Sequence, residues 1–121
     1  MIGVGIDAVE VDRFREVLAR RPRLADRVFT AGERSYAARA NDPVPRLAAR
    51  FAAKEAVMKA LGVGLGAFGF HDVDVVSAPS GAPSLVLSGR AAALAADQGV
   101  VDWRLSLTHT SRSAMAIAVA L

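Results

Sequence analysis

The sequence predicts an α+β fold in which an antiparallel sheet packs against helices within a single compact domain, residues 1–121. Apolar and polar residues alternate with the two-residue period of strands at both ends of the chain, whereas most of the segments between them have helical spacing. Two candidate hairpins with a short helix between them favour antiparallel pairing. Hydrophobic residues make up 53% of the chain, which is ample for one core.

The first element is a strand over residues 2–9, IGVGIDAV. Because side chains alternate along a strand, we expect Val4 and Ile6 on one face and Asp7 with two glycines on the other. We expect these glycines to leave open space around the carboxylate of Asp7.

Two helices follow. From Asp12, which is a typical N-cap residue, an apolar stripe of helical spacing continues toward Pro22. In the second helix, FTAGERSYAARA, Thr30 and Glu33 have the spacing of a capping box. We favour this structural role of Glu33 over a role in catalysis.

A third helix is predicted from about Arg46 to Leu61, and it ends at Gly62. The loop NDPVP, residues 41–45, precedes it. The glycine-rich loop GVGLGAFGF, residues 62–70, follows it. This loop lacks the Lys-Ser/Thr pair and the helix of a Walker motif, so it does not predict a nucleotide-binding P-loop.

The remainder is predicted as two hairpins with a helix between them. Residues 72–78 and 84–89 alternate on either side of the turn PSGAP, and an Ala-rich helix spans residues 90–99. The second hairpin, within residues 103–121, turns at Thr-Ser-Arg. Its last strand has large apolar residues on one face and a row of alanines on the other, which a helix can approach closely: Ala114, Ala116, Ala118 and Ala120.

Basic charge is concentrated early in the chain, although the net charge is only +3. Six arginines lie between positions 13 and 27, against two acidic residues. The cluster indicates either an acidic partner or a solvated helix face, and composition leaves both open. A nucleic-acid-binding module is disfavoured because one Trp and one Tyr give no aromatic-basic interleaving. A membrane-surface helix is disfavoured because the basic segment is short and lacks a Trp anchor.

The absence of Cys excludes disulfides, thiolate metal sites and a Cys nucleophile, and it favours an intracellular protein. No apolar run is long enough to cross a bilayer. The N-terminus reaches an Asp too early for a signal peptide, so we expect none.

The most informative stretch is RFAAKEAVMKALG, residues 50–62, where Glu55 and Lys59 share a helix face with small or apolar residues. An ordinary i,i+4 surface pair contributes only about 0.2–0.5 kcal/mol. Desolvating charges costs several kcal/mol per ion unless other groups compensate. Beside the surface pair, which stays open, we therefore consider that these charges bind a metal, phosphates or both.

Asp7 offers a second carboxylate. Mg²⁺ typically takes one or two carboxylates together with phosphate oxygens and water. If the first strand lies beside the third helix, Asp7 and Glu55 can share one Mg²⁺, with Lys59 beside the phosphates. His109 is either a packed histidine at a strand end or a phosphate contact and proton handler. Arg50 can reach a phosphate or a solvent-side carboxylate.

Three segments together resemble holo-acyl-carrier-protein synthase, the short bacterial type of 4′-phosphopantetheinyl transferase. They are GIDAVEVDRF (5–14), RFAAKEAVMKALG (50–62) and SLTHT (106–110). SGAPSLVLSG (80–89) is also similar to the family's Gly-x-Pro hairpin. Because order, spacing and total length agree, the resemblance spans essentially the whole chain.

The resemblance implies the 4′-phosphopantetheinyl transferase fold and its activity. Such enzymes transfer the 4′-phosphopantetheine group of coenzyme A to a serine of an apo-acyl carrier protein and release adenosine 3′,5′-bisphosphate. They require Mg²⁺ and support fatty-acid or polyketide biosynthesis. The resemblance further implies a cytoplasmic enzyme that is usually a homotrimer with active sites between subunits, and no nucleic-acid or membrane partner.

Site residues follow from the resemblance by position. Asp7 and Glu55 become metal ligands and, with Lys59 at the transferring phosphate or the leaving group, the catalytic residues. The general base is Glu55, Asp7 or a metal-bound water. The implied coenzyme A contacts are Arg50, Lys59, Gly62, Pro83, Thr108 and His109. The implied carrier-protein contacts are Arg13, Arg20, Arg23 and Leu24. Val17 is smaller than the residue that relatives often have there, so we expect the carrier contact to differ in detail.

Overall fold

The computed structural model describes residues 1–121 and confirms the α+β class. Five strands and five α-helices alternate irregularly along the chain, with one short 3₁₀ helix, η1. In chain order they are β1 (Gly3–Glu10), α1 (Val11–Arg20), α2 (Leu24–Val28), α3 (Ala31–Ala37), α4 (Val44–Ala60), η1 (Phe70–Asp72), β2 (Val73–Ser77), β3 (Pro83–Leu87), α5 (Gly89–Asp97), β4 (Trp103–His109) and β5 (Ser113–Ala120).

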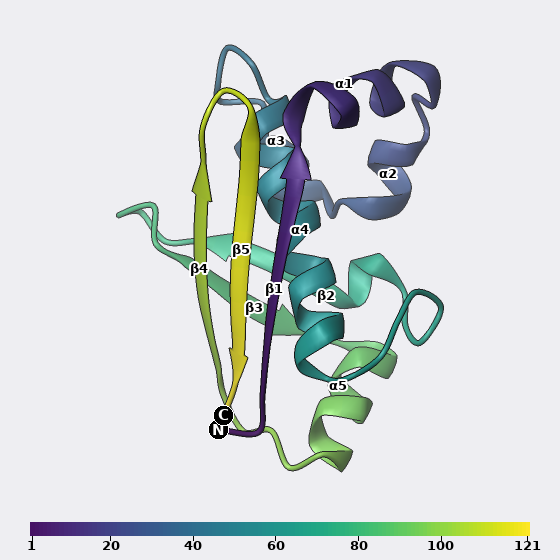
Figure 1. Cartoon of the computed structure of the whole chain (residues 1–121), viewed down its shortest axis with the longest axis vertical. Coiled ribbons are helices and arrows are strands. Elements are labelled where there is room, and N and C mark those ends of the chain that lie inside the picture. Colours follow the sequence, from purple (N-terminus) through teal and green to yellow (C-terminus); the bar gives the residue numbers. More distant parts are fainter.

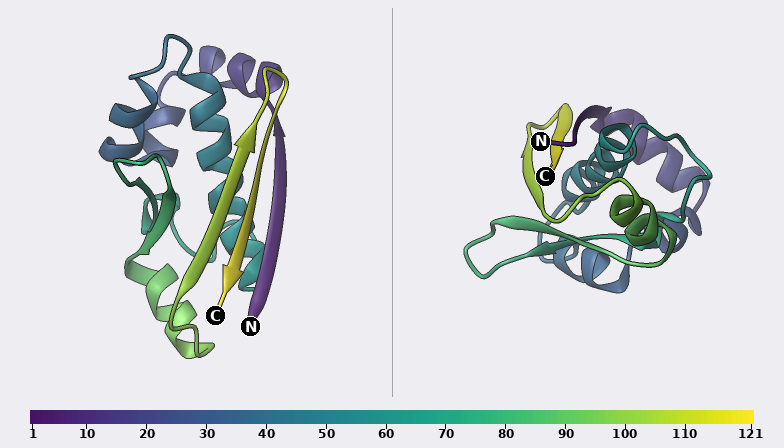
Figure 2. Two further views of the ribbon diagram at one scale, coloured as in Figure 1. Left: turned by 90° about the vertical axis from the view of Figure 1, so that its left-hand side faces the viewer. Right: turned by 90° about the horizontal axis from the view of Figure 1, so that it is seen from below.

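The strands form two antiparallel sheets. The larger has the order β1-β5-β4, so the first strand pairs with the last, and β2 pairs with β3 in a separate hairpin. The three long strands run along the long axis of the molecule with α4 packed on them (Figure 1). Figure 2 shows α4 in the centre, with this sheet on one side and the β2–β3 hairpin and α5 on the other. Helix α4 is therefore the central element of the fold.

Small residues let α4 approach the sheet closely, as the alternating alanines of the last strand predict. The four alanines of β5 are buried against it. On β1, a Cβ added to Gly5 would overlap the carbonyl oxygen of Ala56, and one added to Gly3 would overlap that of Ala60. The expectation that these glycines leave open space around Asp7 is therefore wrong. Their missing side chains are replaced by the backbone of α4, which brings β1 and α4 into direct contact.

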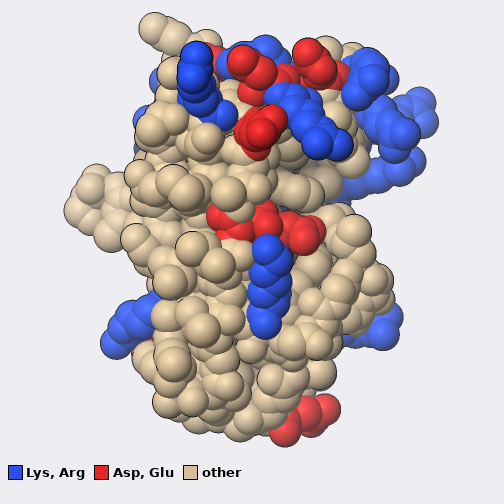
Figure 3. All heavy atoms as spheres, in the orientation of Figure 1, with Lys and Arg blue, Asp and Glu red and all other residues tan.

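The opposite face of the larger sheet is apolar and uncovered. Val4 and Ile6 of β1 point away from α4, which confirms the predicted facing of this strand, and Ile6 is 63% exposed. Met115 and Ile117 of β5 lie on the same outer face and are also exposed. Figure 3 shows that charged side chains are sparse over the strands on this side. The face thus resembles a surface that another protein covers.

Three features of the helices differ from the sequence analysis. Asp12 is not an N-cap: β1 runs directly into α1, Glu10 holds the cap position without a side-chain hydrogen bond, and Asp12 lies in the first turn. Helix α2 was not predicted. Helix α4 begins at Val44, inside the expected loop, because Pro45 is tolerated in the first turn of a helix. The capping box of Thr30 and Glu33 on α3 is confirmed.

Candidate active site

Asp7 of β1 and Glu55 of α4 lie at the same cleft. Asp7 is 16% exposed, and its Oδ1 accepts a hydrogen bond from Lys59 Nζ at 3.0 Å. Lys59 Nζ also donates to the carbonyl oxygen of Ile6 at 2.9 Å. The partner of Lys59 is thus Asp7 rather than Glu55. Since Lys59 is 52% exposed, the expectation that its charge is desolvated is wrong.

Among these charged side chains, Glu55 is the one whose ionised form is disfavoured by its surroundings. Its Oε1 atom is buried and has no hydrogen-bond partner. Burial raises the pKa of Glu55, the negative charge of Asp7 raises this pKa further, and Lys59 opposes the shift. A carboxylate whose charge is disfavoured by burial and by a neighbouring carboxylate, and whose buried oxygen accepts no hydrogen bond, fits an added cation.

The cleft has a volume of about 680 Å³. The ring centroids of Phe14 and Phe51 are 5.4 Å apart, and those of Phe51 and Phe70 are 5.8 Å apart, so three aromatic rings form a continuous wall. The remaining lining is mainly apolar and comes from β1, α1, α2 and the glycine-rich loop: Ala8, Val9, Glu10, Arg13, Val17, Leu24, Val28 and Leu65. The two carboxylates therefore face a cavity that can take an apolar chain as well as a charged group.

The residues assigned to carrier binding lie on and just after α1. Arg13, Arg20 and Arg23 are exposed and Leu24 is half-buried. Arg13 and Leu24 line the cleft of Asp7 and Glu55, and Arg23 and Leu24 also line an adjacent hollow of about 350 Å³. Basic side chains gather over the α1–α2 end of the molecule in Figure 3. This surface is continuous with the cleft.

Arg15 of α1 is not part of this free surface. Its guanidinium makes two hydrogen bonds to the carboxylate of Asp42, at 2.9 and 2.7 Å. These bonds raise the pKa of Arg15 and lower that of Asp42. Asp42 also accepts a hydrogen bond from the backbone N–H of Val44, so the pair ties α1 to the start of α4.

Arg50 lies away from the cleft. Its guanidinium is 4.5 Å from the centre of the Tyr36 ring, and it donates to Ser77 Oγ at 2.9 Å and to the carbonyl of Arg46 at 3.2 Å. Burial lowers the pKa of Arg50, and its Nε atom is buried without a partner. It forms no ion pair with a carboxylate, so the phosphate alternative for Arg50 stays open.

The other residues assigned to coenzyme A also lie outside the cleft. Gly62 follows α4 with φ of 71°, Pro83 begins β3, and Thr108 and His109 end β4. His109 is exposed, so it is not packed within its own chain. Within one chain, the structure brings together Asp7, Glu55 and Lys59 but does not bring the other residues assigned to coenzyme A into their cleft.

A buried network beside the site was not predicted. Lys54 precedes Glu55 on α4 and is fully buried, and its Nζ atom lies 2.9 Å from Glu33 Oε1. Burial lowers the pKa of Lys54, and Glu33 opposes this shift. The sequence contained a signal, a lysine amid alanines, but nothing in the local pattern identifies its partner 21 positions earlier.

Two absences complete the description of the site. No group of three or more His, Cys, Asp or Glu side chains is arranged to hold a metal ion. None of the helices has the length and apolar character needed to span a membrane.

The whole chain is similar to known proteins. Residues 3–120 match the family described as the 4′-phosphopantetheinyl transferase superfamily. A holo-[acyl-carrier-protein] synthase from Frankia casuarinae is 51% identical over 99% of this chain and 97% of its own length. The crystal structure of holo-[acyl-carrier-protein] synthase from Neisseria meningitidis superposes with a TM-score of 0.89 at 30% identity, covering 100% of this chain and 98% of that one. The Bacillus anthracis enzyme in complex with CoA (3′,5′-ADP) has a TM-score of 0.80 at 31% identity, with 98% and 95% covered.

Proposed function

The chain belongs to the 4′-phosphopantetheinyl transferase superfamily as a holo-[acyl-carrier-protein] synthase, and from this premise we propose the reaction that its site carries out. It transfers the 4′-phosphopantetheine group of coenzyme A to a serine of apo-acyl carrier protein. The reaction depends on Mg²⁺ and releases adenosine 3′,5′-bisphosphate. The structural relative bound to CoA supports coenzyme A as the donor.

The carboxylate pair of Asp7 and Glu55 is the observation that carries this proposal. Two carboxylates at one cleft, with the buried Oε1 of Glu55 free of hydrogen bonds, have the donor set that Mg²⁺ takes when phosphates and water complete its shell. The lack of a third protein ligand fits this mode of binding. Asp7 and Glu55 would hold the ion, which when bound supplies charge stabilisation at the diphosphate.

The chain's own residues then perform the remaining tasks. Lys59 is held by Asp7 and the Ile6 carbonyl at an exposed position, where its ammonium stabilises charge on the departing phosphate. Because phosphoryl transfer depends mainly on positioning and electrostatics, no covalent step is required of the protein. Asp7 and Glu55 are the protein groups that can accept the proton of the carrier serine. The aromatic wall gives one side of the cleft an apolar surface next to the two carboxylates.

We propose a homotrimer with active sites between subunits. Arg50, Gly62, Pro83, Thr108 and His109 do not line the cleft of their own chain, so a neighbouring subunit is needed to place coenzyme A contacts beside it. The uncovered apolar face of the β1-β5-β4 sheet supports such an association. Light scattering in solution measures the number of subunits directly, and a monomeric active species would contradict this assembly.

Carrier recognition follows from charge. Arg13 presents positive charge at the cleft and Arg23 at the adjacent hollow, and Arg20 is exposed at the end of α1. Leu24 adds an apolar contact shared by the two hollows. Acyl carrier proteins are acidic, so these arginines steer the encounter and give it a strong dependence on ionic strength. The smaller Val17 leaves more room in this part of the cleft than a larger apolar residue would.

We place this reaction in the cytoplasm, in fatty-acid or polyketide biosynthesis, on a single domain spanning residues 1–121. The Cys-free sequence supports an intracellular location. The test of the reaction is a mass-spectrometric assay of the protein with Mg²⁺, coenzyme A and an apo-acyl carrier protein. The carrier should gain the mass of one phosphopantetheine arm, with equimolar adenosine 3′,5′-bisphosphate. Product formed at an equal rate in chelator, or by Glu55→Gln, would remove the carboxylate pair from the mechanism.

A further inference from the structure

The buried ion pair of Lys54 and Glu33 has no task in the reaction as proposed above. Both side chains are completely inaccessible, and they connect α4 to α3. A buried pair of this kind is weak support for stability, since well-packed apolar residues often stabilise a fold as well or better. Its position beside Glu55 therefore suggests a role in the site.

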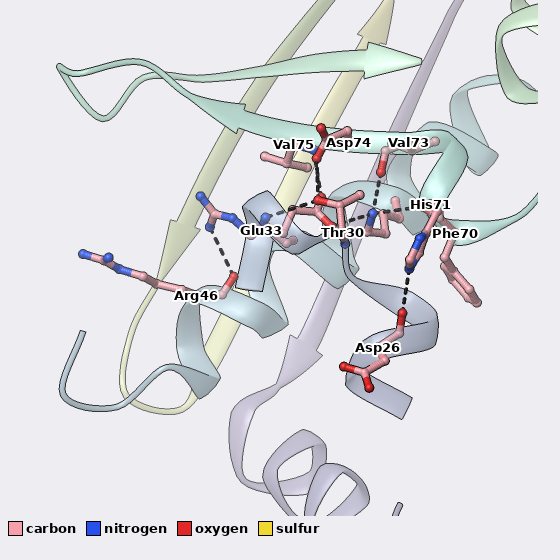
Figure 4. A network of polar contacts seen from close by, with 11 residues as sticks. Asp26, Thr30, Glu33, Arg46, Phe70, His71, Val73, Asp74 and Val75 are labelled. Atoms are coloured by element: carbon pink, nitrogen blue, oxygen red, sulfur yellow. Dashed lines mark hydrogen bonds and ion pairs between the residues drawn. The ribbon is translucent and has the colours of Figure 1, made fainter. Parts of the chain in front are cut away.

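Lys54 holds the two ends of the segment that carries η1. Its Nζ atom donates to the carbonyl oxygen of Phe70 at 2.9 Å and also to the carbonyl oxygen of Val73. Both acceptor residues are labelled in Figure 4. The ring of Phe70 lines the cleft and packs against Phe51, which lies one turn before Glu55 on α4. The ammonium therefore fixes the backbone that presents one member of the aromatic wall.

Glu33 accepts backbone hydrogen bonds on the other side of the network. Its Oε1 accepts from the backbone N–H of Thr30 and its Oε2 from that of Val75, both at 2.8 Å. On the far side of η1, His71 Nε2 is hydrogen-bonded to the carbonyl of Asp26 at 2.7 Å, which joins η1 to α2. Helix α2 supplies Leu24 and Val28 to the cleft. The segment 70–73 is thus held from both sides, by α4 and by α2.

We propose that Lys54 is a positioning residue for the transfer reaction: together with Glu33 it holds Phe70 against Phe51 and so fixes the wall of the cleft that contains Asp7 and Glu55. This inference rests on the proposed function. Neighbouring residues of a helix point about 100° apart, so Lys54 faces the β2 side of α4 while Glu55 faces the cleft. The same turn of α4 therefore carries both a reacting carboxylate and the anchor of the wall around it.

The test is the double variant Lys54→Met/Glu33→Gln. Met keeps most of the lysine stem and Gln keeps a carbonyl oxygen for one of the two backbone donors, while neither leaves an unpaired charge in the core. We expect the double variant to unfold cooperatively and to bind coenzyme A with an affinity close to that of the wild type. We expect kcat to fall by about 10- to 100-fold, because a small misplacement of the site is costly in rate. Hydrogen exchange in a peptide covering residues 63–73 should become faster.

Ala93→Gly is the matched control. Ala93 is an exposed residue of α5, so the substitution lowers stability through helix propensity without contact with the cleft. Phe70→Leu removes the aromatic ring while keeping the ion pair, and it should reproduce the loss of kcat. The inference is overturned if the double variant is folded and keeps the wild-type kcat, or if Phe70→Leu keeps the wild-type kcat. It is also overturned if the double variant loses no more kcat than an equally destabilised Ala93→Gly variant. Absence of transfer by the wild type instead overturns the proposed function.

Discussion

Gly5→Ala tests whether close packing of β1 on α4 sets the geometry of the site. The added Cβ would overlap the carbonyl oxygen of Ala56 and would lie 2.7 Å from the backbone N of Ala60. Both obstacles are helix backbone, so no side chain can rotate away. Relief requires β1 and α4 to separate by an amount on the order of 1 Å, comparable to overpacking a core.

The expected magnitudes follow from this separation. Overpacking typically costs about 1–3 kcal/mol, which for a domain of this size lowers the thermal midpoint by roughly 3–6 °C per kcal/mol. Asp7 lies two residues after Gly5 on the same face of β1, whereas Glu55 moves with α4. The carboxylates therefore separate as well, and a displacement of about 1 Å reduces the transfer rate by up to about 100-fold.

The assay combines calorimetry with the mass-spectrometric rate of carrier modification at a temperature where the variant is folded. Gly64→Ala is the control, because an added Cβ there meets no atom within 4 Å. The control should keep both its thermal midpoint and its rate. A Gly5→Ala variant that unfolds at the wild-type temperature and turns over normally would refute the argument that these glycines set the distance between strand and helix.

Three further predictions concern charge and assembly. In chelator, wild-type stability should decrease relative to Glu55→Gln as pH rises above the ordinary pKa of a glutamate side chain. The folded-state pKa of Glu55 is raised, so the stabilisation from its bound proton is present below the unfolded pKa and is lost as pH rises through the folded one. Denaturant titrations at several pH values measure this, and a constant difference would contradict it. Arg13→Glu or Arg20→Glu should raise the KM for the carrier and spare that for coenzyme A in steady-state assays, and equal losses for both substrates would argue against this division. Ile6→Asp on the uncovered sheet face should give monomers with little transfer activity by light scattering and activity assay, and intact, active oligomers would exclude this face as the interface.

Local patterning was sufficient to predict most of the fold. Strand alternation, the alanine row of β5 and the capping box of α3 are each determined by residues close in sequence. Helix α2 could not be predicted in this way, because its five residues are too few to display a helical period. The N-cap of α1 was misassigned because no loop separates β1 from α1, so the usual capping residue has no place to act.

The site shows where a local interpretation fails. The spacing of Glu55 and Lys59 left an ordinary i,i+4 pair open, yet Lys59 bonds to Asp7 instead, because β1 brings that carboxylate to 3.0 Å. The glycines of β1 correctly indicated that this strand contributes to the site. They make room for the backbone of α4, however, and not for a ligand. Tertiary contact therefore decides both the partner of Lys59 and the meaning of the glycines.

Packing on both sides of α4 explains why the carboxylates can lie on a strand and a helix rather than on loops. On one side, the glycines of β1 and the alanines of β5 meet the helix at backbone distance, so α4 cannot slide along the sheet without steric overlap. On the other side, Lys54 binds two carbonyls and a carboxylate, and these bonds fix the rotation of α4 about its own axis. Sites held by such rigid elements keep their geometry better than sites on loops. The residues proposed to contact coenzyme A, by contrast, lie mainly at strand ends and loops, where a neighbouring subunit can complete their arrangement.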